Sequence, residues 1–163
     1  RLSRRTDFAR NSVAEALEGS AIVHLANRAV EIRHGGGSFW LVGLDSQGAR
    51  EHIRQPGLHD PEVAFAPVPS DAPAILMAHE PDYFAEADHR AFLQISGHTH
   101  GGQANLLGWR PMTPSAFGSR YAWGHIREGE RHLIVSGGVG YSGVPLRLLQ
   151  PPEIVLVRVS GTG

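Results

Sequence analysis

The chain has 163 residues and a formal net charge of −1, and 41% of its residues are hydrophobic while 19% are charged. This size suits one domain with a hydrophobic core, and the scattered charges give no groove for a nucleic acid. Cysteine is absent, which excludes disulfide bonds and leaves imidazole, carboxylate and carbonyl groups as metal ligands, a set suited to Mn, Fe, Zn or Ni.

The first part of the chain predicts one helix followed by short strands. Residues 11–20 have the composition of a helix closed by a glycine. Strands are predicted over 21–25, 29–33 and 38–45, and the turn "HGGG" joins the last two.

The middle of the chain predicts two strands with a helix between them. Residues 46–73 are rich in loops, with a short helix over 61–66. The apolar run 74–78 is typical of a strand buried on both faces. A helix is predicted over 81–90, since it starts with a proline, and the next strand over 91–96.

The last part of the chain predicts mostly β structure. A loop rich in proline and glycine covers 104–119, a hairpin runs over 121–136 and turns at "EGE", and a final strand covers 153–159. The fold class is therefore α/β, with parallel strands that turn antiparallel late in the chain.

Histidines follow two neighbouring strands of this predicted sheet. His79 ends the apolar run 74–78, and His98 and His100 follow the next strand in "GHTHGG". Functional sites of open α/β sheets gather at the carboxyl ends of the strands. We therefore expect these three imidazoles to converge as metal ligands. For the remaining histidines a solvated or internally satisfied side chain is the favoured interpretation; these are His24, His34, His52, His59, His89, His125 and His132.

Two other kinds of site are rejected. A nucleophilic triad would use Ser96 with Asp45 or Asp82, but "ISGHT" is not a G-x-S-x-G elbow and no helix pattern follows it. The literal G-x-G-x-x-G at 138–143 needs a helix after it to face a dinucleotide, and the prolines that follow leave no room for one.

The segments "ILMAHEPD" and "LQISGHTHGGQ" resemble the calcineurin-like metallophosphoesterases, which carry two metal ions. The closing "SGGVGYSGVPLRLLQPPEIVLVRV" resembles the bacterial branch that acts on phosphodiester or pyrophosphate bonds of lipid and nucleotide-sugar substrates, so the resemblance spans nearly the whole chain. It implies the C-terminal half of a four-layer αββα sandwich with a mixed sheet.

The resemblance also implies roles for single residues. His79 and His98 match ligands of the second metal ion, and His100 matches a ligand of the first. The two divalent ions, Mn, Fe, Zn or Ni, would share a hydroxide that attacks the phosphorus atom. The implied substrate is a small-molecule or lipid-linked phosphoester, and the implied location is cytoplasmic or membrane-associated in a bacterium.

The chain departs from the family pattern in its missing motifs. D-x-H, G-D-x-x-D and G-N-H-[DE], which normally come earlier, do not occur. We therefore expect residues 1–163 to be a single partial domain whose N-terminal half, with the acid–base histidine, lies upstream. Such a chain would be inactive alone and would leave one sheet face partly uncovered.

Two alternatives to a phosphoesterase stay open at this point. One is a non-catalytic scaffold or interaction domain that keeps part of the fold. The other is a hydrolase with a single zinc ion held by three histidines.

Overall fold

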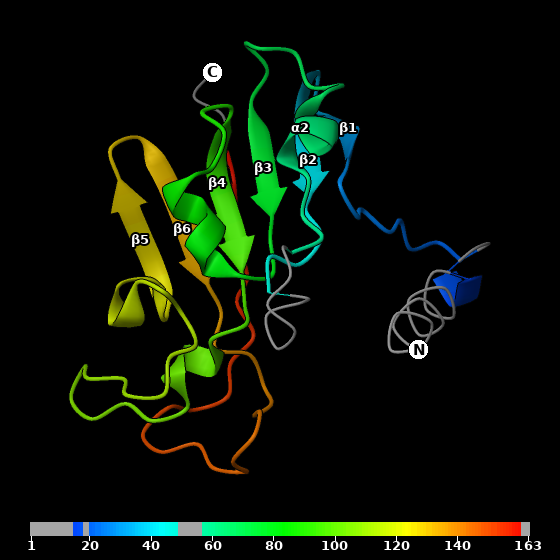
Figure 1. Cartoon of the computed structure of the whole chain (residues 1–163). Helices are drawn as coiled ribbons and strands as arrows, with labels where there is room; N and C mark the ends of the chain where they lie inside the picture. The colour runs from blue at the N-terminus through cyan, green and yellow to red at the C-terminus, as the bar shows by residue number, and fades with distance from the viewer. Residues whose placement is uncertain (1–14, 18–19, 49–56, 161–163) are drawn as a thin grey trace.

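A six-stranded mixed sheet in the order β1-β2-β3-β4-β6-β5 forms the body of the protein, in a computed structural model that describes residues 15–17, 20–48 and 57–160 (Figure 1). The strands are β1 (Arg28–His34), β2 (Gly37–Gly43), β3 (Ala74–Met77), β4 (Ala91–Ser96), β5 (Gly124–Glu128) and β6 (Arg131–Val135). The helices are α2 (Pro61–Phe65) and the 3-10 turns η2 (Pro81–Ala85), η3 (His100–Gly102) and η4 (Gly118–Tyr121). No helix in these ranges is long and apolar enough to cross a membrane.

Parallel pairing at the centre and antiparallel pairing at both edges confirm the predicted α/β class with a mixed sheet. Strands β2, β3, β4 and β6 pair in parallel, while β1 pairs with β2 and β5 with β6 in antiparallel hairpins. The predicted glycine turn joins β1 to β2 through Gly35 and Gly36, which both have positive φ, at 59° and 83°. Two successive residues with positive φ give the hairpin turn that matches strand twist.

Three predicted elements are wrong or shorter than expected. Residues 21–25 form no strand, and neither do residues 153–159. A strand needs a neighbour to accept its hydrogen bonds, and no strand of the described residues pairs with either segment. The helix expected over 81–90 is only the 3-10 turn η2. The helix expected over 11–20 lies mostly outside the described residues, and 15–17 are helical.

Short helices cover one face of the sheet and divide its core into two clusters. The first cluster joins α2 to β2 and β3, and the second joins η2 and η4 to β6. Tyr83 belongs to the first cluster and Phe84 to the second, so η2 bridges the two.

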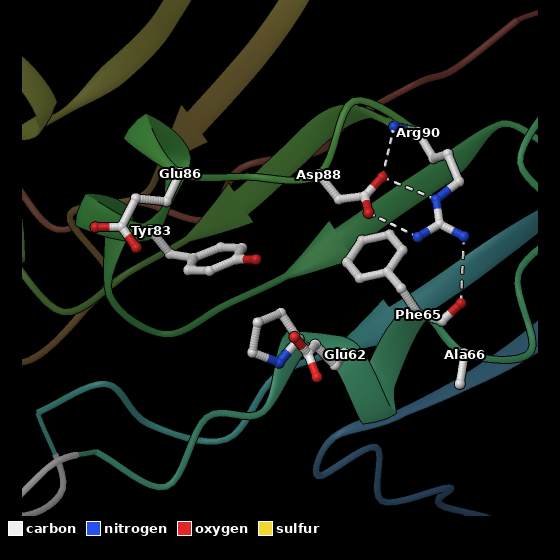
Figure 2. Close-up of a pocket in the computed structure, with 8 residues that line it drawn as sticks. Glu62, Phe65, Ala66, Tyr83, Glu86, Asp88 and Arg90 are labelled. Atoms are coloured by element: carbon white, nitrogen blue, oxygen red, sulfur yellow. Dashed lines mark hydrogen bonds and ion pairs between the residues drawn. The ribbon is translucent and has the colours of Figure 1, made fainter.

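An arginine clamp fixes the chain where it enters β4 (Figure 2). The guanidinium of Arg90 donates to both carboxylate oxygens of Asp88, at 2.8 and 2.6 Å, and to the carbonyl of Val68 at 2.6 Å. It also lies over the ring of Phe65, 5.0 Å from its centroid. The clamp therefore ties the end of α2 to the turn before β4, beside a cavity of about 370 Å³ that Tyr83 also lines.

We expect Arg90→Met to lower the free energy of unfolding by about 2 kcal/mol, because it leaves the carboxylate and a carbonyl without their donor. Arg33→Met is the matched control, since Arg33 is exposed and its ion pair with Glu31 is worth little. Urea unfolding of both variants measures the difference. Equal destabilisation would contradict a structural role for the clamp.

The ion pair of Arg90 with Asp88 should make the stability of the fold depend on pH in the acidic range. Hydrogen bonds from Arg90 lower the pKa of Asp88 from 3.8 to about 2. A lowered carboxyl pKa stabilises the fold above the unfolded value, and this contribution is lost as the pH falls through the folded one. The stability difference between the wild type and Asp88→Asn should therefore be full above about pH 4 and shrink between about pH 4 and 2. Thermal unfolding across this range tests it, and a constant difference would contradict it.

Candidate metal centre

The pairing of β3 with β4 places two histidines at one edge of the sheet. Met77 lies opposite Ile95 in the parallel register, so both strands end at the same level. The pairing continues beyond the strands, because the amide of Ala78 donates to the carbonyl of Ile95 at 3.2 Å and the amide of Gly97 donates to that of His79 at 3.1 Å. His79 and the turn that carries His98 are therefore held side by side at the carboxyl ends of their strands.

The rings of His79 and His98 contact each other. Their centroids lie 5.1 Å apart and their planes are inclined by 75°. When two imidazole nitrogens each lie about 2.0–2.1 Å from one ion at angles of about 90–110°, the ring centroids are roughly 4.5–5.3 Å apart. The distance between His79 and His98 therefore fits two ligands of a single ion.

His100 lies in η3 and makes no ring contact with this pair. The described residues contain no group of three histidine, aspartate or glutamate side chains that could hold a metal ion. His100 is still near enough to His98 to lower its pKa slightly. Of the three predicted ligands, the structure thus brings two together, and it gives no support to one zinc ion held by all three.

The histidine turn has an unusual backbone. His98 and His100 have positive φ, 66° and 50°, and so does Gln103, at 53°. Side-chain-bearing residues seldom occupy this left-handed region, and each such position costs on the order of 1 kcal/mol or more. Strain of this kind is often found at functional sites, where the surrounding structure holds it in place.

Thr99 holds the turn from its centre. It is only 1% exposed, and its hydroxyl donates to the carbonyl of Ala122 at 2.6 Å and accepts from the amide of Gly101 at 3.3 Å. Its own carbonyl accepts from the amide of Gly102 at 2.7 Å. A buried threonine between the two histidines therefore fixes the direction in which each one leaves the backbone.

Loop segments that lie at the lower end of the sheet in Figure 1 also contact and stabilise this turn. The buried Gln103 accepts from the amide of Ser142 at 2.5 Å, and the buried Gln150 accepts from Arg110 at 2.5 Å. Arg110 also donates to the carbonyl of Gly101. Residues 138–143, the G-x-G-x-x-G segment, belong to these loop segments, and no helix follows them, as predicted.

Burial favours the neutral form of the His98 ring. Burial lowers the pKa of His98 most, and the neighbouring His79 lowers it further, while Glu80 and Asp82 raise it by less. The neutral imidazole is the form that binds a metal ion. The turn therefore offers His98 in its ligating form.

The acidic neighbours of the histidines have structural partners. Glu80 is 7% exposed, and burial raises its pKa, but hydrogen bonds from Ser46, Gly48 and Gln47 outweigh burial and the net pKa is lowered. Asp82 accepts from Ser115 at 2.5 Å and from the amide of Ala116 at 2.7 Å. Both carboxylates thus fasten loops around the site.

The rejected triad finds no support in these contacts. The hydroxyl of Ser96 is buried and accepts from Gln94 at 3.0 Å, and Asp82 is bonded to the 115–116 segment. The sequence interpretation missed the residues that brace the turn: Thr99, Gln103, Arg110 and Gln150. Their one signal was the glycine pair after His100, which indicates that other groups approach the backbone closely.

Several known proteins that are similar to this chain are named metallophosphoesterases or phosphodiesterases. The uncharacterised metallophosphoesterase YkuE of Bacillus subtilis is 39% identical over 90 residues, 55% of this chain and 32% of that protein. An uncharacterised metallophosphoesterase of Helicobacter pylori strain J99 is 32% identical over 152 residues, 91% of this chain and 36% of that protein. Phosphodiesterase YaeI of Escherichia coli is 31% identical over 149 residues, 90% of this chain and 51% of that protein.

Each match covers only part of the relative's length. The chain spans about a third to a half of the length of these relatives. Similar proteins occur in animals as well as in bacteria. No family model matches the chain, and no solved structure matches it.

The bracing of the turn can be tested with two glycines of similar backbone. Gly101 and Gly138 have φ of 63° and 59°, but an added Cβ at Gly101 would lie 2.5 Å from the side chain of Gln150, whereas nothing lies within 4 Å of one at Gly138. Gln150 is held by Arg110 and has little room to move. We expect Gly101→Ala to lower the free energy of unfolding by about 1–2 kcal/mol more than Gly138→Ala.

Denaturant unfolding of the two variants measures this difference. The penalty of the left-handed backbone is common to both, so it cancels in the comparison. Equal losses of stability would show that Gln150 does not pack against the turn as described.

Proposed function

This chain belongs to the calcineurin-like metallophosphoesterase family, and we propose that, with the part of its relatives that it does not span, it hydrolyses a phosphoester with the help of bound divalent metal ions. The observation that carries the proposal is the pair of contacting imidazoles at the carboxyl edge of the sheet, His79 and His98. A phosphoesterase of this family needs its metal ligands at that edge.

The residues of this chain have separate tasks in the proposal. His79 and His98 hold one ion, which their ring distance fits, and His100 holds a second ion from the other side of the turn. Thr99 directs both histidines of the turn by its hydrogen bond to Ala122. Bound divalent ions would supply positive charge for the phosphate oxygens and a water of lowered pKa.

We assign the remaining ligands and the acid–base residue to the part of the relatives that this chain does not span. Neither Glu80 nor Asp82 is placed among the ligands, because their oxygens accept bonds from the loops around the site. The chain alone is therefore proposed to be inactive, with residues 1–163 forming a single partial domain.

In this proposal, the part of the relatives that this chain does not span also completes the fold. The face of the sheet opposite α2 and η2 carries the apolar side chains of Met77 and the half-buried Ile95, and Met77 is 38% exposed. Ile154 and Leu156 in the segment once predicted as a strand are 91% and 89% exposed. We infer that a second sheet covers this face and pairs with residues 153–159, as in a four-layer sandwich.

The loops around the histidines favour a lipid-linked phosphoester as the substrate. Four apolar side chains on these loops are highly exposed: Leu107 at 103%, Trp109 at 64%, Tyr141 at 59% and Leu149 at 67%. Apolar surface of this extent beside a site for a charged phosphate suits a substrate that joins a phosphate to a hydrocarbon chain. The name of the relative YaeI, a phosphodiesterase, favours a diester over a monoester.

A non-catalytic scaffold explains the site less well. A scaffold has no need for two histidines in left-handed conformations, because strain at His98 and His100 only lowers stability unless the rings are used. If both rings bind metal ions, the strained backbone is needed to position them.

We expect the full-length protein to hydrolyse an aryl phosphodiester when Mn²⁺ is supplied, and His98→Gln to lower kcat/KM at least 100-fold, which corresponds to about 2.7 kcal/mol of transition-state stabilisation. His89→Gln is the matched control, since its side chain is 83% exposed and lies in the turn before β4. Steady-state kinetics of both variants decides the matter. Full activity of the His98 variant would overturn the assignment of the metal site, and loss of activity in both would point to misfolding, which circular dichroism detects.

A further inference from the structure

A second pair of imidazoles contacts outside the candidate metal centre. Nε2 of His125 and Nδ1 of His132 lie 2.7 Å apart. The ring centroids are 5.0 Å apart and the planes are nearly parallel, inclined by 20°. The sequence pattern does not link these two histidines, and each was interpreted as a solvated or internally satisfied side chain.

The register of the edge hairpin brings the two rings together. Strands β5 and β6 are joined by a tight turn at Gly129 and Glu130, and Arg127 lies opposite His132 while His125 lies opposite Ile134. His125 and His132 are therefore diagonal neighbours on one face of the antiparallel pair, within reach of each other. The alternate side chains of these strands, among them Leu133 and Val135, fill the second core cluster on the other face.

The pair of His125 and His132 lies outside the hydrophobic core. His125 is exposed and His132 is half-buried, and the contact between them is solvent-exposed. One ring donates and the other accepts in this contact, so two nitrogens that could bind a metal ion already lie side by side. Arg127 lies opposite His132 but is engaged elsewhere, because it donates to the carbonyl of Gly129 at 2.8 Å and to Glu130 at 2.9 Å.

We propose that His125 and His132 form a second, independent metal site for one Zn²⁺ or Cu²⁺ ion that links β5 to β6. Two imidazoles on one tetrahedral ion have their ligating nitrogens about 3.3 Å apart, so the present contact needs to open by about 0.6 Å, a small ring rotation. The ring that now donates moves its hydrogen to its other nitrogen, so both rings bind as neutral imidazoles and no proton is lost.

The donor set selects the class of ion. Imidazole suits Zn²⁺, Cu²⁺ and Ni²⁺, while Mg²⁺, Ca²⁺ and Mn²⁺ prefer oxygen ligands. Glu128 is not available to the ion, because it accepts from Arg120 and Tyr121. The site therefore favours Cu²⁺ over Zn²⁺, in the usual order of stability for nitrogen ligands, and leaves Mn²⁺ unbound.

The site lies where an ion would stabilise the sheet. β5 is an edge strand, and its single neighbour in the sheet is β6. An ion that bridges the two strands opposes fraying of this edge, and it raises the unfolding temperature as the free ion concentration rises above the dissociation constant.

The test uses calorimetric titration of Zn²⁺ into the full chain with His79→Gln and His98→Gln, which removes the imidazole pair of the candidate metal centre. In this background we expect one bound ion, weakened at least 10-fold by His125→Gln or by His132→Gln. The matched control is His34→Gln, an exposed histidine at the end of the other hairpin, which should leave the affinity unchanged. Excess Mg²⁺ should not compete.

Equal zinc affinity in the parent, the His125 variant and the His132 variant would overturn the proposal. If a variant fails to fold by circular dichroism, electron paramagnetic resonance of Cu²⁺ on the folded parent decides instead. Hyperfine splitting from two imidazole nitrogens supports the site, and a spectrum without them contradicts it. Because the parent lacks both His79 and His98, either outcome leaves the proposed phosphoesterase function untouched.

Discussion

The parallel pairing of β3 with β4 is the constraint on which the site depends. It sets Met77 opposite Ile95 and continues as a hydrogen bond from Gly97 to the carbonyl of His79. One step of register between these strands would turn every side chain to the opposite face and separate the two histidines. The register is fixed in turn by buried residues such as Leu76 and Leu93, so the hydrophobic core and the site are specified together.

The turn that follows β4 is strained, and the rest of the molecule keeps it so. The positive φ of His98 and His100 is maintained by Thr99, which is buried and bonded to the segment before β5. Gln150, from a loop much later in the chain, packs against Gly101 and is held there by Arg110. Such bracing limits how far the imidazoles move when a ligand arrives, which favours a preorganised site over one assembled by binding.

The sequence predicted the centre of the fold better than its margins. Buried apolar runs and glycine turns are local signals, and they placed β1 to β4, α2 and the final hairpin closely. Residues 21–25 and 153–159 read as strands from composition alone, but a strand also needs a neighbour, which a local pattern does not reveal. The neighbourhood of His79 and His98 followed from strand order. The braces Arg110 and Gln150, and the contact of His125 with His132, depend on register and distant loops and left no pattern in the sequence.

Nuclear magnetic resonance of the ring nitrogens of His79 and His98 during titration with Zn²⁺ tests the central claim most directly. The account predicts that both rings respond together, with one shared midpoint, because they hold the same ion. A response of one ring while the other keeps its resonance position would contradict it.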